Sequence, residues 1–143
     1  AYCGRTSFGK SQMIFVDSNI AIYAVGKPHP LQKEAQEFFL NARKRGLHLV
    51  SSAEVLQELL NVYMPVRRWD ELEAAFALME DGIDEIFPIY KELLLTAKNE
   101  MSHFPSLTSR DLLHLVTCQR WQIKEIKTFD RSLAAAFKKT LGH

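Results

Sequence analysis

Short apolar segments alternate with longer segments of helical periodicity along nearly the whole chain. A short apolar run between turn residues suits a strand that is buried on both faces of a sheet. The predicted strands are 13–16, 47–50, 83–87 and 123–129, and the predicted helices are 20–24, 31–45, about 53–64, 68–80, a segment opened by Pro88, 110–121 and 133–139. This alternation predicts an α/β domain with a mostly parallel central sheet covered by helices on both faces.

Serine and proline residues mark the expected starts of several helices. A serine side chain at the N-cap accepts a hydrogen bond from a free backbone amide of the first turn. Ser51 or Ser52 is therefore predicted to cap the helix after the second strand, and Ser109 the helix over 110–121. Pro88 suits the first position of a helix, where the N–H that it lacks has no partner in any case.

The size and composition of the chain suit a single domain. Its 143 residues leave no room for a second core, and we expect the domain to span 13–143. Residues 1–12 lack the apolar centre of a secretory signal, and we expect them to be a disordered leader or expression tail. Cys3 and Cys118 form no CxxC or zinc-type spacing, which favours a reducing, cytoplasmic setting. The net charge of +1 does not by itself predict binding to nucleic acid.

Four acidic residues occupy positions where the site of an α/β domain is expected. Asp17 ends the first predicted strand and Asp130 follows the last, and open α/β sheets bind their ligands off the carboxyl ends of the strands. Asp111 lies in the first turn of a predicted helix, and Glu58 lies in the helix after the second strand. We therefore expect the four acids to meet at one edge of the sheet.

Each of these acids also has a structural explanation when it is taken alone. Asp17 and Asp130 could cap the helices that follow them, and Asp111 could interact with the dipole of its own helix. Glu58 could be a solvated surface residue. The placement of all four near the same edge favours a functional site over four separate structural roles.

Glu54 competes with Glu58 for a place in this site. At ~100° per residue, the apolar residues of the helix over 53–64 form one arc. Glu58 falls roughly 40° from Val62 at the edge of this arc, and Glu54 lies roughly 40° further towards the polar face. We therefore prefer Glu58 as the site residue and keep Glu54 as an alternative.

A cluster of carboxylates is unfavourable unless protons or cations neutralise it. Two carboxylates ~4 Å apart repel by about 1 kcal/mol in water and by several times more in a less polar cleft. Hard oxygen ligands select Mg²⁺ or Mn²⁺, which keep several waters and bind the phosphates of a substrate. Such an ion lowers the pKa of a water molecule and stabilises charge on phosphoryl oxygens. The four acids therefore predict metal-dependent hydrolysis of a phosphodiester bond.

Four short motifs resemble those of a known family. The stretch 14–19 (IFVDSN) resembles the opening of PIN domains, particularly the VapC-like toxins of bacterial and archaeal toxin–antitoxin pairs. The stretch 51–59 (SSAEVLQEL) is similar to their second motif, in which the acid before Leu falls on Glu58. The stretches 109–114 (SRDLLH) and 128–131 (TFDR) resemble their Arg-Asp helix start and their closing Thr-x-Asp. The order and separation of the motifs extend the resemblance over nearly the whole chain.

The resemblance implies a role for each of the four acids. Asp17, Glu58 and Asp111 would be the core ligands of the metal ion and would be catalytic. Asp130 would be a further ligand of the ion, or an acid that lies next to the ligands without binding the ion itself.

The resemblance also assigns roles to polar neighbours of these acids. Asn19 and Thr128 would support the site by hydrogen bonds to carboxylates or to metal-bound water. Arg110 would either pair with an acid or contact an RNA phosphate, and Arg131 is a candidate for RNA contact. His114, one helical turn after Asp111, is expected to be a packed and hydrogen-bonded side chain rather than a base.

A fold and an activity follow from the same resemblance. A PIN domain is a three-layer α/β/α sandwich with a mostly parallel sheet of four or five strands. Its reaction would be endonucleolytic cleavage of single-stranded or loop RNA by a water that Mg²⁺ or Mn²⁺ activates, leaving a 3′-hydroxyl and a 5′-phosphate. Members commonly form homodimers, and a cognate antitoxin protein holds the toxins inactive. The segments 64–69 and 101–107 follow no pattern of the family, which leaves the RNA target open.

Two other functions remain alternatives. A phosphatase of the haloacid dehalogenase type would use Asp17 as its nucleophile, but such enzymes usually carry a second Asp where this chain has Asn19. A PIN-like module that binds RNA or protein without cleavage would be expected to have lost some of the four acids, and all four are present. We therefore favour the nuclease.

Overall fold

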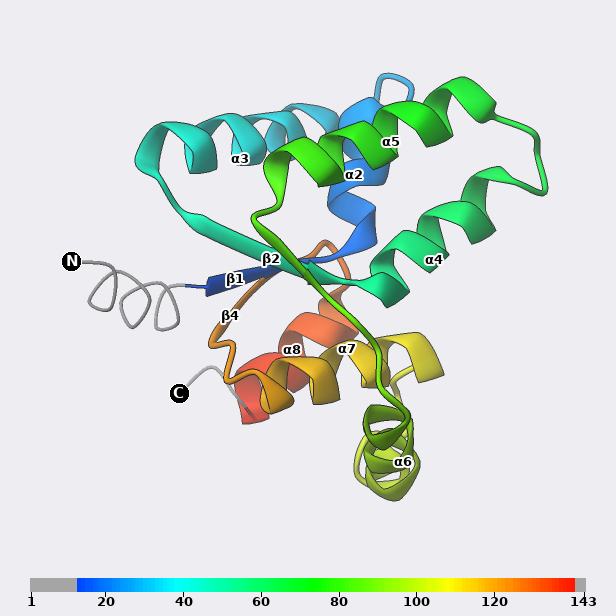
Figure 1. The fold of residues 1–143 in the computed structure, drawn as a ribbon, viewed down its shortest axis with the longest axis vertical. Coiled ribbons are helices and arrows are strands. Elements are labelled where there is room, and N and C mark those ends of the chain that lie inside the picture. Colours follow the sequence, from blue (N-terminus) through cyan, green and yellow to red (C-terminus); the bar gives the residue numbers. More distant parts are fainter. Residues whose placement is uncertain (1–12, 141–143) are drawn as a thin grey trace.

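Four parallel strands form the central sheet of the computed structural model, which describes residues 13–140 (Figure 1). The strands are β1 (Met13–Val16), β2 (His48–Ser52), β3 (Glu85–Phe87) and β4 (Glu125–Lys127), in the spatial order β3-β2-β1-β4. The helices are α2 (Ser18–Val25), α3 (Gln32–Arg45), α4 (Ala53–Tyr63), α5 (Trp69–Gly82), α6 (Lys91–Glu100), the 3₁₀-helix η1 (Met101–His103), α7 (Ser109–Arg120) and α8 (Arg131–Thr140). The predicted α/β class and the parallel sheet are confirmed.

The order of the sheet reverses at β1. The chain passes from β1 to β2 and β3 on one side and returns on the other side as β4. Phe15 of β1 pairs with Val50 of β2 and with Ile126 of β4. Such a reversal leaves a crevice off the carboxyl ends of the strands, where open α/β sheets bind their ligands. Asp17, the first residue after β1, lies at this point.

Helices cover both faces of the sheet (Figure 1). α2, α3 and α5 pack together on one face, and α6, α7 and α8 lie on the other. α4 follows β2 directly, packs on α2 and α5, and also contacts α7. α4 therefore brings its side chains to the carboxyl edge of the sheet from one helical layer, and α7 does so from the other.

The core is built around β1 and α7. Phe15 and Val16 of β1 are inaccessible to solvent, as expected for a strand enclosed on both faces. Every residue of α7 from 112 to 118 is buried, because this helix packs against α4, α6 and α8 and contacts Phe15 of β1 through His114. Side chains at the start of α7 are thus held by a rigid element.

Two predicted helix caps differ from the structure. Thr108, not Ser109, caps α7, because the Thr108 hydroxyl oxygen accepts a hydrogen bond from the Asp111 amide at 3.2 Å. Ser52 stands at the N-cap of α4, but its side chain makes no capping bond. The Ser51 hydroxyl donates instead to the backbone carbonyl oxygen of Val16 at 2.9 Å, which joins β2 to the end of β1.

Several element boundaries also differ from the prediction; β2, for example, extends to Ser52 and β3 begins at Glu85. Pro88 precedes α6 rather than opening it, because α6 begins at Lys91 and its N-cap residue Tyr90 is still extended. β4 covers less than 123–129, because the short β1 offers partners only to Glu125, Ile126 and Lys127. α2 begins earlier than residue 20, because Asp17 caps it.

Residues 1–12, where we expected a leader, and residues 141–143 lie outside the part of the chain that the structure describes. Between residues 13 and 140, no helix is both long enough and apolar enough to cross a membrane.

The packing of β2 gives a direct test of this core. Leu49 is 2% exposed and Leu40 is 59% exposed. We expect Leu49→Ala to lower the free energy of unfolding by about 2–5 kcal/mol, because it leaves a cavity in the core. Leu40→Ala, the same change at the surface of α3, should stay within about 0.5 kcal/mol of the parent. Urea denaturation of both variants measures the difference, and equal losses would contradict the packing described.

Candidate metal centre

Asp17 is a buried carboxylate held by several hydrogen-bond donors. It is 3% exposed and forms the N-cap of α2, where its Oδ1 atom accepts from the Ser18 amide at 2.7 Å. Its Oδ2 atom accepts from the Thr128 hydroxyl at 2.7 Å and from the Asn19 side-chain amide at 3.3 Å. The capping role and a place in the cluster are therefore compatible, because each oxygen of the carboxylate has its own donors.

Asn19 and Thr128 tie the end of β1 to the loop after β4. The Asn19 amide nitrogen also donates to the Thr128 hydroxyl oxygen at 3.2 Å, and the Asn19 carbonyl oxygen accepts from the Phe129 amide at 3.2 Å. The Thr128 oxygen further accepts from the Asp130 amide at 3.0 Å. This is a full set for a hydroxyl group, which has one donor and two acceptor positions. The network fixes the direction in which the Asp17 carboxylate points.

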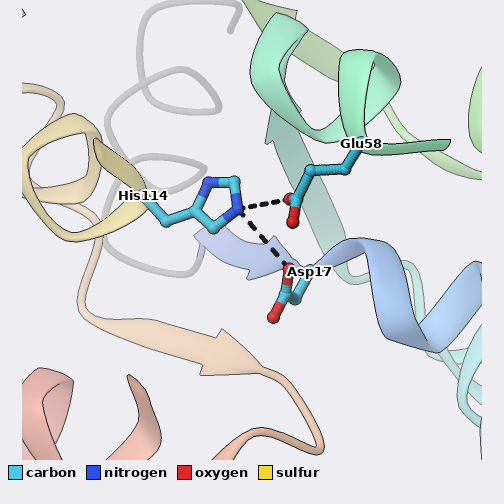
Figure 2. Close-up of side chains that lie close together, drawn as sticks. All are labelled: Asp17, Glu58 and His114. Atoms are coloured by element: carbon cyan, nitrogen blue, oxygen red, sulfur yellow. Dashed lines mark hydrogen bonds and ion pairs between the residues drawn. The ribbon is translucent and has the colours of Figure 1, made fainter. Parts of the chain in front are cut away.

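Glu58 and His114 approach Asp17 from α4 and α7 (Figure 2). The His114 Nε2 atom lies 2.7 Å from Glu58 Oε1 and 3.6 Å from Asp17 Oδ1. Within residues 13–140, one ligand atom from each of these three residues lies within 4.8 Å of the other two. Figure 2 shows the imidazole pointing between the two carboxylates.

Sequence reasoning missed the central place of His114. His114 is fully buried and hydrogen-bonded, as expected, but its partner is a candidate metal ligand rather than a core group. The available signal was its spacing, because residues three apart on a helix share a face. His114 therefore had to point to the same side of α7 as Asp111.

Asp111 and Asp130 lie at the margin of this group. Burial, together with the charges of Asp130 and Asp17, raises the pKa of Asp111 to about 6. The Asp130 Oδ1 atom accepts from the Leu133 amide at 3.0 Å, so Asp130 caps α8. The structure thus brings all four predicted acids to one edge of the sheet, with Asp17 and Glu58 at its centre and Asp111 close enough to interact electrostatically with Asp17 and Asp130.

Glu54 and Arg110 form a separate pair beside the cluster. The Arg110 Nε atom lies 3.8 Å from Glu54 Oε2, and both side chains are partly exposed. Glu58, rather than Glu54, contributes to the compact group of ligand atoms. Of the two roles considered for Arg110, pairing with an acid is present. Arg131, at the start of α8, is exposed.

Burial controls the electrostatics at the centre of the cluster. It raises the pKa of the Asp17 carboxyl above its usual value, and the charge of Glu58 adds to this rise, although His114 and the Thr128 hydrogen bond oppose it. For His114, burial alone lowers the pKa, but the hydrogen bond to Glu58 and the nearby carboxylates outweigh it and raise the pKa overall. Burial therefore disfavours the ionised form of Asp17, whereas the carboxylates around His114 favour the protonated form of its ring.

A family model and several known proteins match this chain. The model of the PIN domain matches residues 14–139. The chain belongs to the PIN-domain family. It is 45% identical over 126 residues to ribonuclease VapC23 of Mycobacterium tuberculosis, a match that covers 88% of this chain and 99% of that protein. It is 35% identical over 119 residues to ribonuclease VapC13 of the same organism, which covers 83% of this chain and 91% of that protein.

A solved structure has the same fold as this PIN domain. The crystal structure of Mycobacterium tuberculosis VapC20, a sarcin–ricin loop cleaving toxin, gives a TM-score of 0.73 and covers 86% of this chain and 94% of that one. At 16% sequence identity this similarity shows the fold alone. The family and the sequence relatives show that the chain is an endoribonuclease of the VapC toxin type. The phosphatase and the non-catalytic module are therefore rejected.

The residues of the PIN-domain site fit a divalent cation. Asp17, Glu58 and Asp111 supply carboxylate oxygens, the ligands that Mg²⁺ and Mn²⁺ prefer. Burial raises the pKa of both Asp17 and Asp111, as it does for carboxylates that no nearby cation neutralises. A bound cation would offset the free-energy cost of keeping these buried carboxylates ionised.

The raised pKa of Asp111 predicts a gain in stability when its charge is removed. The pKa is about 6 in the folded PIN domain against 3.8 for the free group, so the folded state binds the proton more tightly and ionised Asp111 destabilises it. Asp111 is partly exposed, so solvent screens its charge and reduces the effect. We expect Asp111→Asn to raise the free energy of unfolding by about 1 kcal/mol at pH 7.5 in chelator. The gain should shrink at pH 5, where Asp111 in the folded parent is mostly protonated.

Urea denaturation in EDTA at the two pH values measures this effect. Glu73→Gln, an exposed change in α5, is the matched control and should stay within about 0.5 kcal/mol of the parent at both. A loss of stability in Asp111→Asn at pH 7.5 would mean that this carboxylate supports the fold.

Proposed function

We propose that this endoribonuclease hydrolyses single-stranded or loop RNA with Mg²⁺ or Mn²⁺ held by the carboxylates of Asp17, Glu58 and Asp111. The observation that carries the proposal is the approach of Glu58 on α4 to the buried Asp17 after β1, at the reversal point of the sheet. Asp130, which influences the pKa of Asp111, is a further ligand or an acid just outside the ligands. The products carry a 3′-hydroxyl and a 5′-phosphate.

The chain's own residues prepare the site for this ion. The Ser18 amide, the Thr128 hydroxyl and the Asn19 amide hold Asp17 in one orientation before any ligand arrives. Such preorganisation means that little conformational entropy is lost when the site binds its ligands. When bound, the ion lowers the pKa of a water molecule and stabilises charge on the phosphoryl oxygens.

Two arginines beside the cluster suit contact with the RNA backbone. Arg110 lies in the first turn of α7 next to Asp111, and its side chain is 40% exposed despite the pair with Glu54. Arg131 lies at the start of α8, next to Asp130. Arginine binds phosphate through paired N–H groups, so both residues are placed to hold a phosphate near the acids.

The partners are a cognate antitoxin and a second copy of the chain. VapC toxins are generally paired with VapB antitoxins. Large apolar side chains are exposed where α4 passes into α5: Val62, Met64, Val66 and Trp69. Exposed apolar side chains of this size favour association, and we assign them to the homodimer. The protein would act in the cytoplasm, where its RNA substrate and the antitoxin are made.

Loss of one carboxylate tests the proposed function. Asp17→Asn should reduce cleavage of a labelled single-stranded RNA in Mn²⁺ by at least about 100-fold, because several kcal/mol of charge stabilisation are lost with the ligand. EDTA should abolish cleavage by the parent, and added Mn²⁺ should restore it. Glu73→Gln, outside the cluster, should cleave like the parent. Cleavage that resists the chelator, or a fully active Asp17→Asn, would overturn the proposal.

A further inference from the structure

His114 is a polar side chain enclosed completely within the protein and directed at the cluster. It is 0% exposed, and its Nε2 atom contacts Glu58 and Asp17 (Figure 2). Its other ring nitrogen, Nδ1, is buried and has no hydrogen-bond partner within the described residues. The ring therefore makes its polar contacts with the two carboxylates of the centre.

The neighbours of Nε2 decide which atom carries a hydrogen. Glu58 Oε1 at 2.7 Å and Asp17 Oδ1 at 3.6 Å are both acceptors when these side chains are ionised. An unprotonated Nε2 would direct its lone pair at both oxygens and repel them. With both carboxylates ionised, Nε2 therefore carries a hydrogen in the neutral ring as well as in the charged one. A nitrogen that carries a hydrogen has no lone pair for a metal ion.

Packing holds the ring in this orientation. The imidazole lies against the Phe15 ring of β1, with the centroids 5.4 Å apart and the planes tilted by 49°. Its neighbours in sequence, Leu113 and Leu115, are buried in the same helix. The donor on Nε2 is thus rigid, whereas Glu58 has a long side chain that emerges from α4 at the edge of the site and keeps 14% of its surface exposed.

We propose that His114 is a positioning residue, which donates its Nε2 hydrogen to Glu58 and holds that carboxylate against Asp17 in the arrangement that binds the metal ion. The hydrogen bond occupies one oxygen of Glu58 and leaves the other free for the ion. His114 is thus neither a ligand nor a base. The inference rests on the proposed metal-binding function of the same site. Loss of such a supporting hydrogen bond typically weakens metal binding about 10–100-fold.

Two substitutions separate the hydrogen bond from the packing. His114→Leu fills the buried position with an apolar side chain that has no donor, and Mn²⁺ affinity measured by calorimetry should fall about 10–100-fold. His114→Gln can place an amide N–H near the position of Nε2 and should bind Mn²⁺ within about 10-fold of the parent. Equal affinity of His114→Leu and the parent would overturn the inference, and so would an equally large loss in both variants.

Pulsed EPR of the Mn²⁺-loaded parent tests the role of Nε2 without any substitution, so it remains decisive if His114→Leu does not fold. We expect no ¹⁴N coupling of the size that a directly bound imidazole gives. Such a coupling in the parent, lost in His114→Gln, would show that His114 is a ligand and overturn the inference.

Asp17→Asn separates this inference from the proposed function. If the parent binds no Mn²⁺ by calorimetry, or if Asp17→Asn binds it as the parent does, the proposed function fails and the inference fails with it. If the parent binds Mn²⁺ and Asp17→Asn does not, an unchanged affinity in His114→Leu defeats the inference alone.

Discussion

Negative charge buried at the carboxyl end of β1 is the constraint on which the surrounding structure depends. A carboxylate with almost no contact with water is costly unless donors or cations compensate it. The backbone amide of Ser18 and the side chains of Asn19 and Thr128 supply the donors for Asp17. Because Thr128 follows β4, the same hydrogen bonds that stabilise the carboxylate also join the carboxyl ends of the central strand β1 and the edge strand β4.

The hydrogen-bond donors do not neutralise the negative charge of the cluster. The functional site therefore costs stability, which other parts of the domain must supply. Glu58, Asp111 and Asp130 add further negative charge at the same edge, and the pKa of Asp111 rises to about 6. Strain of this kind is typical of functional sites and is tolerated when the rest of the fold is stable enough. Here the buried β1 and the enclosed α7 provide that stability, and an ion that binds only the folded state would add to it.

Much of this site was predictable from the sequence because it depends on strand ends and helix faces. An acid directly after a buried strand must lie at the edge of a parallel sheet, which placed Asp17 and Asp130 together. The angular position of Glu58 on its helix distinguished it from Glu54. The resemblance to PIN domains added Asn19 and Thr128, whose hydrogen bonds to Asp17 are present.

Features that depend on competition between neighbours were not predictable. Ser109 and Thr108 are both good caps, and only the path of the loop decides that Thr108 reaches the Asp111 amide. Pro88 is compatible with a helix start, but the helix begins only at Lys91, after the extended residue Tyr90. The contact between His114 and Glu58 joins two helices from opposite layers, and no local pattern specifies how closely such helices approach.

The central claim is that these acids meet in order to hold a divalent ion. An anomalous difference map from crystals of the unmodified protein grown with Mn²⁺ tests it most directly. We expect a peak within coordination distance of the carboxylate oxygens of Asp17 and Glu58, with Asp111 as a direct or water-mediated neighbour. Well-ordered crystals with no peak at this edge of the sheet, or with Mn²⁺ bound only elsewhere, would contradict the claim.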